Sequence, residues 1–187
     1  MGTWHTRGLR GSALEELINF SNEKYKEKGL ALIQKIPTPI TPIRMDPASR
    51  QITLAYFNQK STVDYIGAVQ GYPVCFDAKE CAGSVFSLAN VHPHQMDFMA
   101  SFENQKGIAF LILYFTALEE LYYLPYRDLK FFWDRMKTGG RKSIRYEEID
   151  KTYRILQRGE MIVAYLDCLE QDLQFRRAGQ QGRAPGR

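Results

Sequence analysis

The spacing of apolar and polar residues divides the chain into helices and strands. A helix is predicted from Ser12, which forms a capping box with Glu15, to a stop at Gly29. Alternating or continuous apolar runs predict strands at residues 30–36, 51–57, 61–69, 72–79, 108–115 and 122–125. The run at 108–115, IAFLILYF, is apolar throughout, which is typical of a central strand buried on both faces.

Helical patterns lie between and after these strands. They cover residues 92–105, residues 126–137 and part of 159–175, and glycines follow the first two. Helices interleaved with strands indicate an α/β fold with a mixed β-sheet.

Four prolines, at positions 37, 39, 42 and 47, interrupt the region before the strand at 51–57. Proline lacks the N–H donor that a central strand needs, so this region lies outside the main sheet. We expect an arm, about residues 36–57, that leaves the core, turns near Pro47 and returns. An ordinary hairpin at the sheet edge would give the same pattern.

Composition changes this picture little. The 187 residues are 44% hydrophobic and 25% charged, with a net charge of +4, which fits one globular body. We divide the chain into a basic N-terminal arm (1–11), a single domain (12–175) and a basic, disordered tail (176–187). No apolar run is long enough for a membrane helix or a secretory signal, so a cytoplasmic location is expected.

Several chemistries are disfavoured. Three scattered cysteines make neither a disulfide framework nor a zinc site. Glycine-rich phosphate loops and the nucleophile elbow are missing from the sequence. Cys75 is expected to be a core thiol that faces away from Asp77.

Candidate chemistry gathers around the two strands at 61–69 and 72–79. Asp77 and Lys79 are two apart and share a strand face, and the turn between the strands brings Asp64 alongside. Two carboxylates form a hard-oxygen site for Mg²⁺ or Mn²⁺, and a lysine nearby stabilises developing negative charge. Thr62 and Gln95 are near enough to add oxygen atoms. The alternative is a solvent-facing Asp–Lys pair with no catalytic role.

These residues lie within a longer stretch of sequence that is similar to a known family. The sequence resembles the RecU-type Holliday junction resolvases of Gram-positive bacteria over about residues 7–173. The matching segments are an RG and a following LEE, then KIPTPI, AYFNQKSTVDYIG, VCFDAKE, HPHQMDFM, FFWDR and GGRKSI. At position 77 many relatives carry Glu where this chain has Asp.

The resemblance implies a restriction-endonuclease-like fold, in which a mixed sheet is flanked by helices and the proline-bearing hairpin forms a stalk. It also implies a homodimer that binds a four-way DNA junction and nicks two symmetry-related strands with Mg²⁺. Its metal site falls on Thr62, Asp64, Asp77 and Gln95, and its catalytic lysine on Lys79. A recombinase or a branch-migration helicase are further expected partners.

Within this frame the basic residues are expected to contact phosphate. They are Arg7, Arg10, Arg44, Arg141, Lys142 and Arg145. Two other functions stay open: a nuclease of the same fold acting on other DNA, and a non-catalytic DNA-binding or strand-annealing module of recombination.

Overall fold

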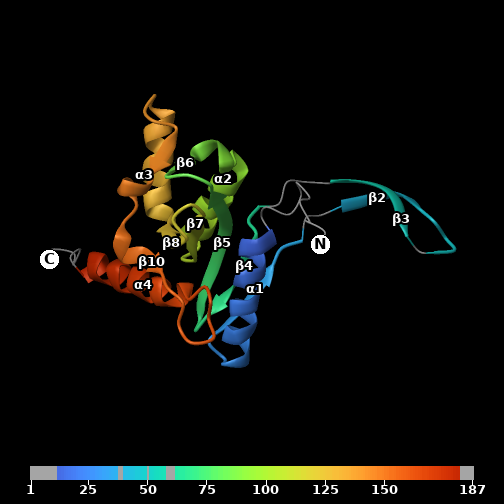
Figure 1. The fold of residues 1–187 in the computed structure, drawn as a ribbon, viewed down its shortest axis with the longest axis horizontal. Coiled ribbons are helices and arrows are strands. Elements are labelled where there is room, and N and C mark those ends of the chain that lie inside the picture. Colours follow the sequence, from blue (N-terminus) through green and yellow to red (C-terminus); the bar gives the residue numbers. More distant parts are fainter. Residues whose placement is uncertain (1–11, 38–39, 50, 58–61, 182–187) are drawn as a thin grey trace.

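The computed structural model describes residues 12–37, 40–49, 51–57 and 62–181, and within them one six-stranded sheet forms the centre (Figure 1). The strand order is β1-β4-β5-β7-β8-β10, and only β5 and β7 run parallel. The sheet is therefore mixed, as expected. Its strands are β1 (Ala31–Lys35), β4 (Tyr65–Val69), β5 (Tyr72–Cys81), β7 (Ile108–Phe115), β8 (Glu120–Pro125) and β10 (Arg154–Ile155).

Helices cover both faces of this sheet, so the body has three layers (Figure 1). Helices α1 (Ser12–Glu27) and α4 (Tyr165–Gln181) bury one core, and α2 (Pro93–Asn104) and α3 (Tyr126–Lys137) bury the other. No helix in the described residues is long and apolar enough to cross a membrane.

Strand β7 shows why the two cores form. Ile108, Phe110 and Ile112 point to the α1/α4 side, and the alternate residues Leu111 and Leu113 point to the α2/α3 side. All five are at most 2% exposed, which confirms the prediction of a central strand buried on both faces.

A smaller group of elements lies beside α3. Strand β6 (Val85–Ser87) pairs with β9 (Ser143–Arg145), and the 3-10 helix η1 (Leu88–Asn90) leads from β6 towards α2. Two further 3-10 helices, η2 (Tyr146–Glu148) and η3 (Lys151–Tyr153), connect β9 to β10.

The proline-bearing arm stands apart from the body. Strands β2 (Ile40–Met45) and β3 (Ile52–Phe57) pair only with each other and project well beyond the sheet (Figure 1). At the turn, the Asp46 carboxylate accepts hydrogen bonds from the Ala48 N–H and the Ser49 hydroxyl, at 3.1 and 2.6 Å. The structure therefore confirms a protruding hairpin and excludes an edge hairpin of the main sheet.

The expected disordered tail from Arg176 is partly wrong, because α4 continues through Gln181. The Arg176 guanidinium donates to both Glu103 carboxylate oxygens at 2.7 and 2.8 Å, and Arg177 donates to the Tyr72 hydroxyl at 2.7 Å. These tertiary contacts extend the folded domain past residue 175. They hold in the helix a stretch whose composition by itself is typical of a linker. Residues 1–11 and 182–187 lie outside the described residues.

Candidate functional site

The two candidate carboxylates meet where β4 begins. Tyr65 pairs with Phe76 in the antiparallel ladder, so Asp64, just before Tyr65, comes opposite Asp77. The Asp64 N–H donates to Asp77 Oδ1 at 2.9 Å, and Asp64 Oδ2 accepts from the Ala78 N–H at 3.2 Å. The Asp77 carboxylate thus bonds the backbone of Asp64, and the Asp64 carboxylate bonds the backbone next to Asp77. These two bonds fix the carboxylates side by side.

Asp77 is fully buried, and a buried carboxylate is costly unless donors surround it. Lys79, on the same face of β5, places its Nζ 2.8 Å from Asp77 Oδ2. The Gln95 side-chain N–H donates to the same oxygen. With the Asp64 N–H on Oδ1, both oxygens of Asp77 are hydrogen-bonded.

Gln95 reaches this position from the first turn of α2. Pro93 begins the helix after His92, and the His92 N–H donates to Gln95 Oε1 at 2.9 Å. Because the amide oxygen accepts this capping bond, the amide nitrogen faces Asp77. Gln95 therefore holds Asp77 in place, and its amide would have to turn over to offer an oxygen to a metal.

Thr62, the fifth candidate, is exposed and precedes Asp64 by two residues. Among the contacts found for the described residues, its side chain makes no hydrogen bond to the other four. The structure therefore brings Asp64, Asp77, Lys79 and Gln95 into one cluster, and Thr62 is not joined to it by any of these contacts.

Charge is unbalanced among the described residues of this cluster, because the carboxylates of Asp64 and Asp77 face one ammonium group, that of Lys79. Burial, and then the neighbouring Asp77 carboxylate, raise the pKa of Asp64 above its ordinary value. A hard divalent cation between the carboxylates would remove this repulsion, so the donor set fits Mg²⁺ or Mn²⁺. The cluster supplies two carboxylates, and nowhere in the described residues, this cluster included, do three or more His, Cys, Asp or Glu residues gather into a group that could hold a metal.

Cys75 corrects one expectation. It is buried, as predicted, but it packs in the α2/α3 core and so points to the same side of β5 as Asp77. Side chains two apart on a strand share a face, and the prediction overlooked this parity. Burial raises the pKa of the Cys75 thiol, which suits a core residue and not a nucleophile.

The predicted DNA-binding residues do not form one patch. Arg44 lies exposed on the protruding hairpin, and Arg141, Lys142 and Arg145 lie exposed between α3 and the end of β9. Arg7 and Arg10 fall outside the described residues.

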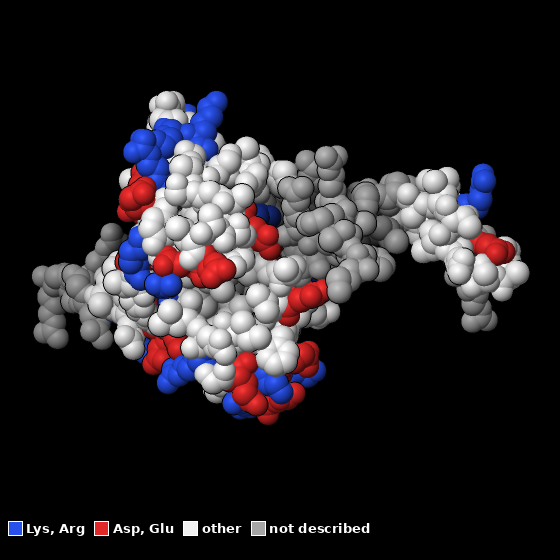
Figure 2. Space-filling view, viewed as in Figure 1, with Lys and Arg blue, Asp and Glu red and all other residues white. Residues whose placement is uncertain are grey.

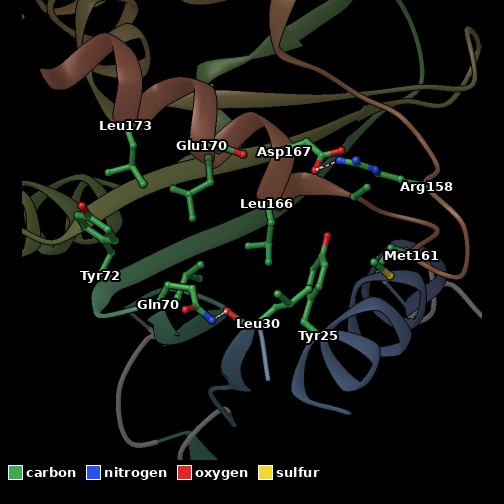
Figure 3. Close-up of a pocket in the computed structure, with 13 residues that line it drawn as sticks. Tyr25, Leu30, Gln70, Tyr72, Arg158, Met161, Leu166, Asp167, Glu170 and Leu173 are labelled. Atoms are coloured by element: carbon green, nitrogen blue, oxygen red, sulfur yellow. Dashed lines mark hydrogen bonds and ion pairs between the residues drawn. The ribbon is translucent and has the colours of Figure 1, made fainter. Parts of the chain in front are cut away.

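A cavity of about 410 Å³ lies apart from these residues (Figure 3). It opens between the end of α1, the β4–β5 turn and α4, with Tyr25, Leu166 and Met161 in its wall and the Arg158–Asp167 ion pair at 2.8 Å on its rim. Tyr72, at the start of β5, also lines it, whereas Asp77 and Lys79 lie near the other end of that strand. None of the candidate catalytic or metal residues lines this cavity.

Comparison with known proteins decides the family. The family model of RecU, recombination protein U, matches residues 9–171. The chain belongs to this family. Curated relatives include proteins named "Holliday junction resolvase RecU" from Geobacillus sp. (strain WCH70), 43% identical over 148 residues, and from Bacillus thuringiensis (strain Al Hakam), 42% identical over 149 residues.

These alignments cover 77% and 78% of this chain, respectively, and 74% of each relative. Among solved structures, Hjc from Archaeoglobus fulgidus, a Holliday junction resolvase from an archaeal hyperthermophile, matches at 9% identity with a TM-score of 0.35. That match covers 59% of this chain and 77% of Hjc.

Proposed function

We propose that this protein is an endonuclease that resolves four-way (Holliday) DNA junctions by paired symmetric nicks during recombination and repair. One observation carries the proposal: Asp64 and Asp77 are locked together beside Lys79 in a chain of the recombination protein U family. The names of the relatives support the junction as the substrate.

We further propose that the site works with a divalent metal, Mg²⁺, for which Mn²⁺ substitutes. Asp64 and Asp77 would hold it, Thr62 could add its hydroxyl oxygen, and Gln95 either keeps Asp77 in place or turns its amide oxygen inwards. When bound, the metal supplies charge neutralisation at a phosphate oxygen and a water of lowered pKa.

Lys79 has the position required of the cationic assistant. It is part-buried and pairs with Asp77 at 2.8 Å. Beside a phosphate at the two carboxylates, its ammonium group would orient the water nucleophile and stabilise the negative charge that develops.

The wider assembly is also part of the proposal. A homodimer places two such sites on the symmetry-related strands of a junction, since a two-fold dimer matches a two-fold substrate. The hairpin of β2 and β3, which projects beyond the body (Figure 1), enters the junction centre in this assembly. The basic residues named above contact phosphates.

The deciding experiment is an incubation of purified protein with a labelled, immobile four-way junction, in Mg²⁺ and in EDTA, beside Asp77→Asn. We expect paired symmetric nicks that need both Mg²⁺ and Asp77. The variant should lose about 1000-fold or more in rate, because it loses a carboxylate from the metal site.

Other outcomes point to the alternative functions. Equal cleavage of junction and linear duplex in competition would indicate a nuclease with a different target. Tight junction binding without nicking under any divalent metal would overturn catalysis and leave a DNA-binding module.

A further inference from the structure

The segment of residues 139–145, which runs from the end of α3 through β9, leaves the helix in a fixed shape. Gly139 adopts a left-handed conformation (φ +87°) after the helix end at Thr138. Gly140 then donates its N–H to the Arg135 carbonyl at 2.9 Å, and a Cβ at Gly140 would lie 2.7 Å from that oxygen. Both glycines are therefore required for this path of the chain.

One carboxylate, that of Glu148, ties the segment at several points. It accepts from the Arg135 guanidinium on one oxygen, and from the Arg145 N–H at 2.8 Å and Arg141 Nη1 at 3.3 Å on the other. Arg135 also donates to the Ser143 carbonyl at 2.7 Å. The bond from Arg135, and then the one from the Arg145 N–H, hold the pKa of Glu148 at about 2, so it is ionised at working pH.

The segment presents cations outwards. Within the described residues, the exposed side chains of Lys142 and Arg145 form no ion pair, and Arg141 is 41% exposed and uses only one nitrogen on Glu148. Figure 2 shows basic side chains gathered at this end of the molecule, over the end of α3. By contrast, Lys130 on the same helix pairs with Asp134.

The backbone of the segment is fixed against the elements that build the catalytic cluster. Ile144 pairs with Phe86 in β6, and the Leu88 N–H donates to the Lys142 carbonyl at 3.1 Å. Beyond Leu88 the chain continues through η1 into α2, whose first turn holds Gln95 against Asp77. The cations therefore stand at a fixed offset from the carboxylates.

We propose that residues 139–145 form a preshaped phosphate-binding element that grips a duplex arm of the DNA, and that Glu148 is the positioning residue that sets its shape. This inference rests on the proposed function, because it assumes that the chain binds DNA. In this proposal the acidic Glu148 strengthens the binding of a polyanion. It does so because it holds the basic side chains in place beforehand, and preorganised side chains lose less conformational freedom on binding.

A count of charges alone predicts the opposite effect of Glu148 on DNA affinity, so the test distinguishes the two explanations. Glu148→Gln removes a negative charge beside the DNA, so unaided electrostatics predicts tighter binding. We expect Glu148→Gln to bind about tenfold more weakly. The slope of log K against log salt concentration should become shallower by about 2, because two phosphate contacts are lost and each contributes about 0.9 to that slope.

Glu147→Gln is the matched control. Glu147 is the exposed neighbour of Glu148, and its replacement removes the same charge without touching Arg135 or Arg141. We expect Glu147→Gln to bind as well as the parent protein or slightly better. Arg135→Lys is the second variant: it keeps the charge, loses the forked contact to Glu148 and Ser143, and should weaken binding like Glu148→Gln.

Binding is measured by fluorescence anisotropy in EDTA, on a junction and on a duplex with the same arm sequence, across a salt series. Both probes should weaken equally, since the element grips an arm and not the crossover. Cleavage in Mg²⁺ should show a raised KM and an unchanged kcat at saturating junction. Thermal melts identify any variant that fails to fold, and if Glu148→Gln fails, Arg135→Lys carries the test.

Equal or tighter binding by folded Glu148→Gln and Arg135→Lys would overturn the inference. A parent protein that binds junctions without cutting them would refute the proposed function and leave this inference standing. A parent protein that binds neither probe would refute both.

Discussion

Two aspartates, Asp77 and Asp172, are both fully buried, and their surroundings differ in charge. The Asp172 carboxylate, on α4, accepts hydrogen bonds from Arg127, from the Arg176 guanidinium at 3.0 Å and from the Tyr123 hydroxyl at 3.1 Å. Asp77 receives one lysine, one amide and one backbone N–H, and has a second carboxylate beside it.

The Asp172 carboxylate is neutralised by two arginines, whereas among the described residues Asp64 and Asp77 share one ammonium group, that of Lys79. Arg176 also binds Glu103, and Arg127 lies 3.7 Å from the partly exposed Asp128, in a network that joins α4 to α2 and α3. A fully satisfied network stabilises the fold, whereas a site with excess negative charge is built to receive a cation. Burial of a charge therefore does not identify a functional site; its balance does.

The largest expected effects on stability and nicking come from the change of Asp to Asn, made at position 172 and at position 77. Asp172→Asn leaves two arginines without their carboxylate and should lower the free energy of unfolding by about 3–5 kcal/mol. The nicking rate per folded molecule should not change, because the bonding partners of Asp172 are Tyr123, Arg127 and Arg176, none of which belongs to the cluster. Urea unfolding with junction cleavage at low temperature measures both; a stable Asp172→Asn would contradict the structural role.

Asp77→Asn should show the reverse result. Its free energy of unfolding should stay within about 1 kcal/mol of the parent, since the change relieves the repulsion with Asp64 while it loses the lysine pair. Mg²⁺ should raise the melting temperature of the parent protein and not that of Asp77→Asn, because the proposed metal site keeps both carboxylates only in the parent. Equal Mg²⁺ stabilisation of the two proteins would place the metal elsewhere.

Lys79→Met tests the cation that pairs with Asp77 in this cluster. The variant loses the one positive charge that the described residues place beside the two carboxylates, so the metal-free protein should be less stable and Mg²⁺ should stabilise it more than the parent. Nicking should fall about 100-fold if Lys79 is the cationic assistant proposed above. Lys130→Met, which breaks an exposed pair on α3, is the control and should leave the Mg²⁺ effect unchanged.

The smallest expected effect is a pH dependence at a third carboxylate, Glu148. Its pKa is lowered from 4.5 to about 2 in the fold, so its bonds add stability above about pH 4.5 that is lost as the pH falls towards 2. The difference in melting temperature between the parent and Glu148→Gln should therefore shrink over that window. A constant difference from pH 6 to pH 2.5 would show that the ionised form is not what stabilises the segment.

Much of the site follows from local sequence. The turn after Val69 sets the β4–β5 register, and that register brings Asp64 opposite Asp77, while strand parity places Lys79 beside Asp77. The prolines predicted the protruding hairpin for the same kind of local reason, because a missing N–H excludes them from a central strand. Regular backbone geometry makes such inferences reliable over a few residues.

The remaining features depend on contacts between residues far apart in the chain. Glycines and arginines after residue 175 read as a tail, yet Arg176 is held in α4 by Glu103, 73 residues away in sequence. The Gln95 amide is oriented by a local cap at His92 together with a bond to Asp77, 18 residues away in sequence. Local propensity is worth tenths of a kcal/mol per residue, and a buried ion pair or hydrogen-bond network outweighs it. The amino-acid sequence alone therefore predicted which residues gather in the candidate site, and only the packing of the layers decided how their charges are balanced.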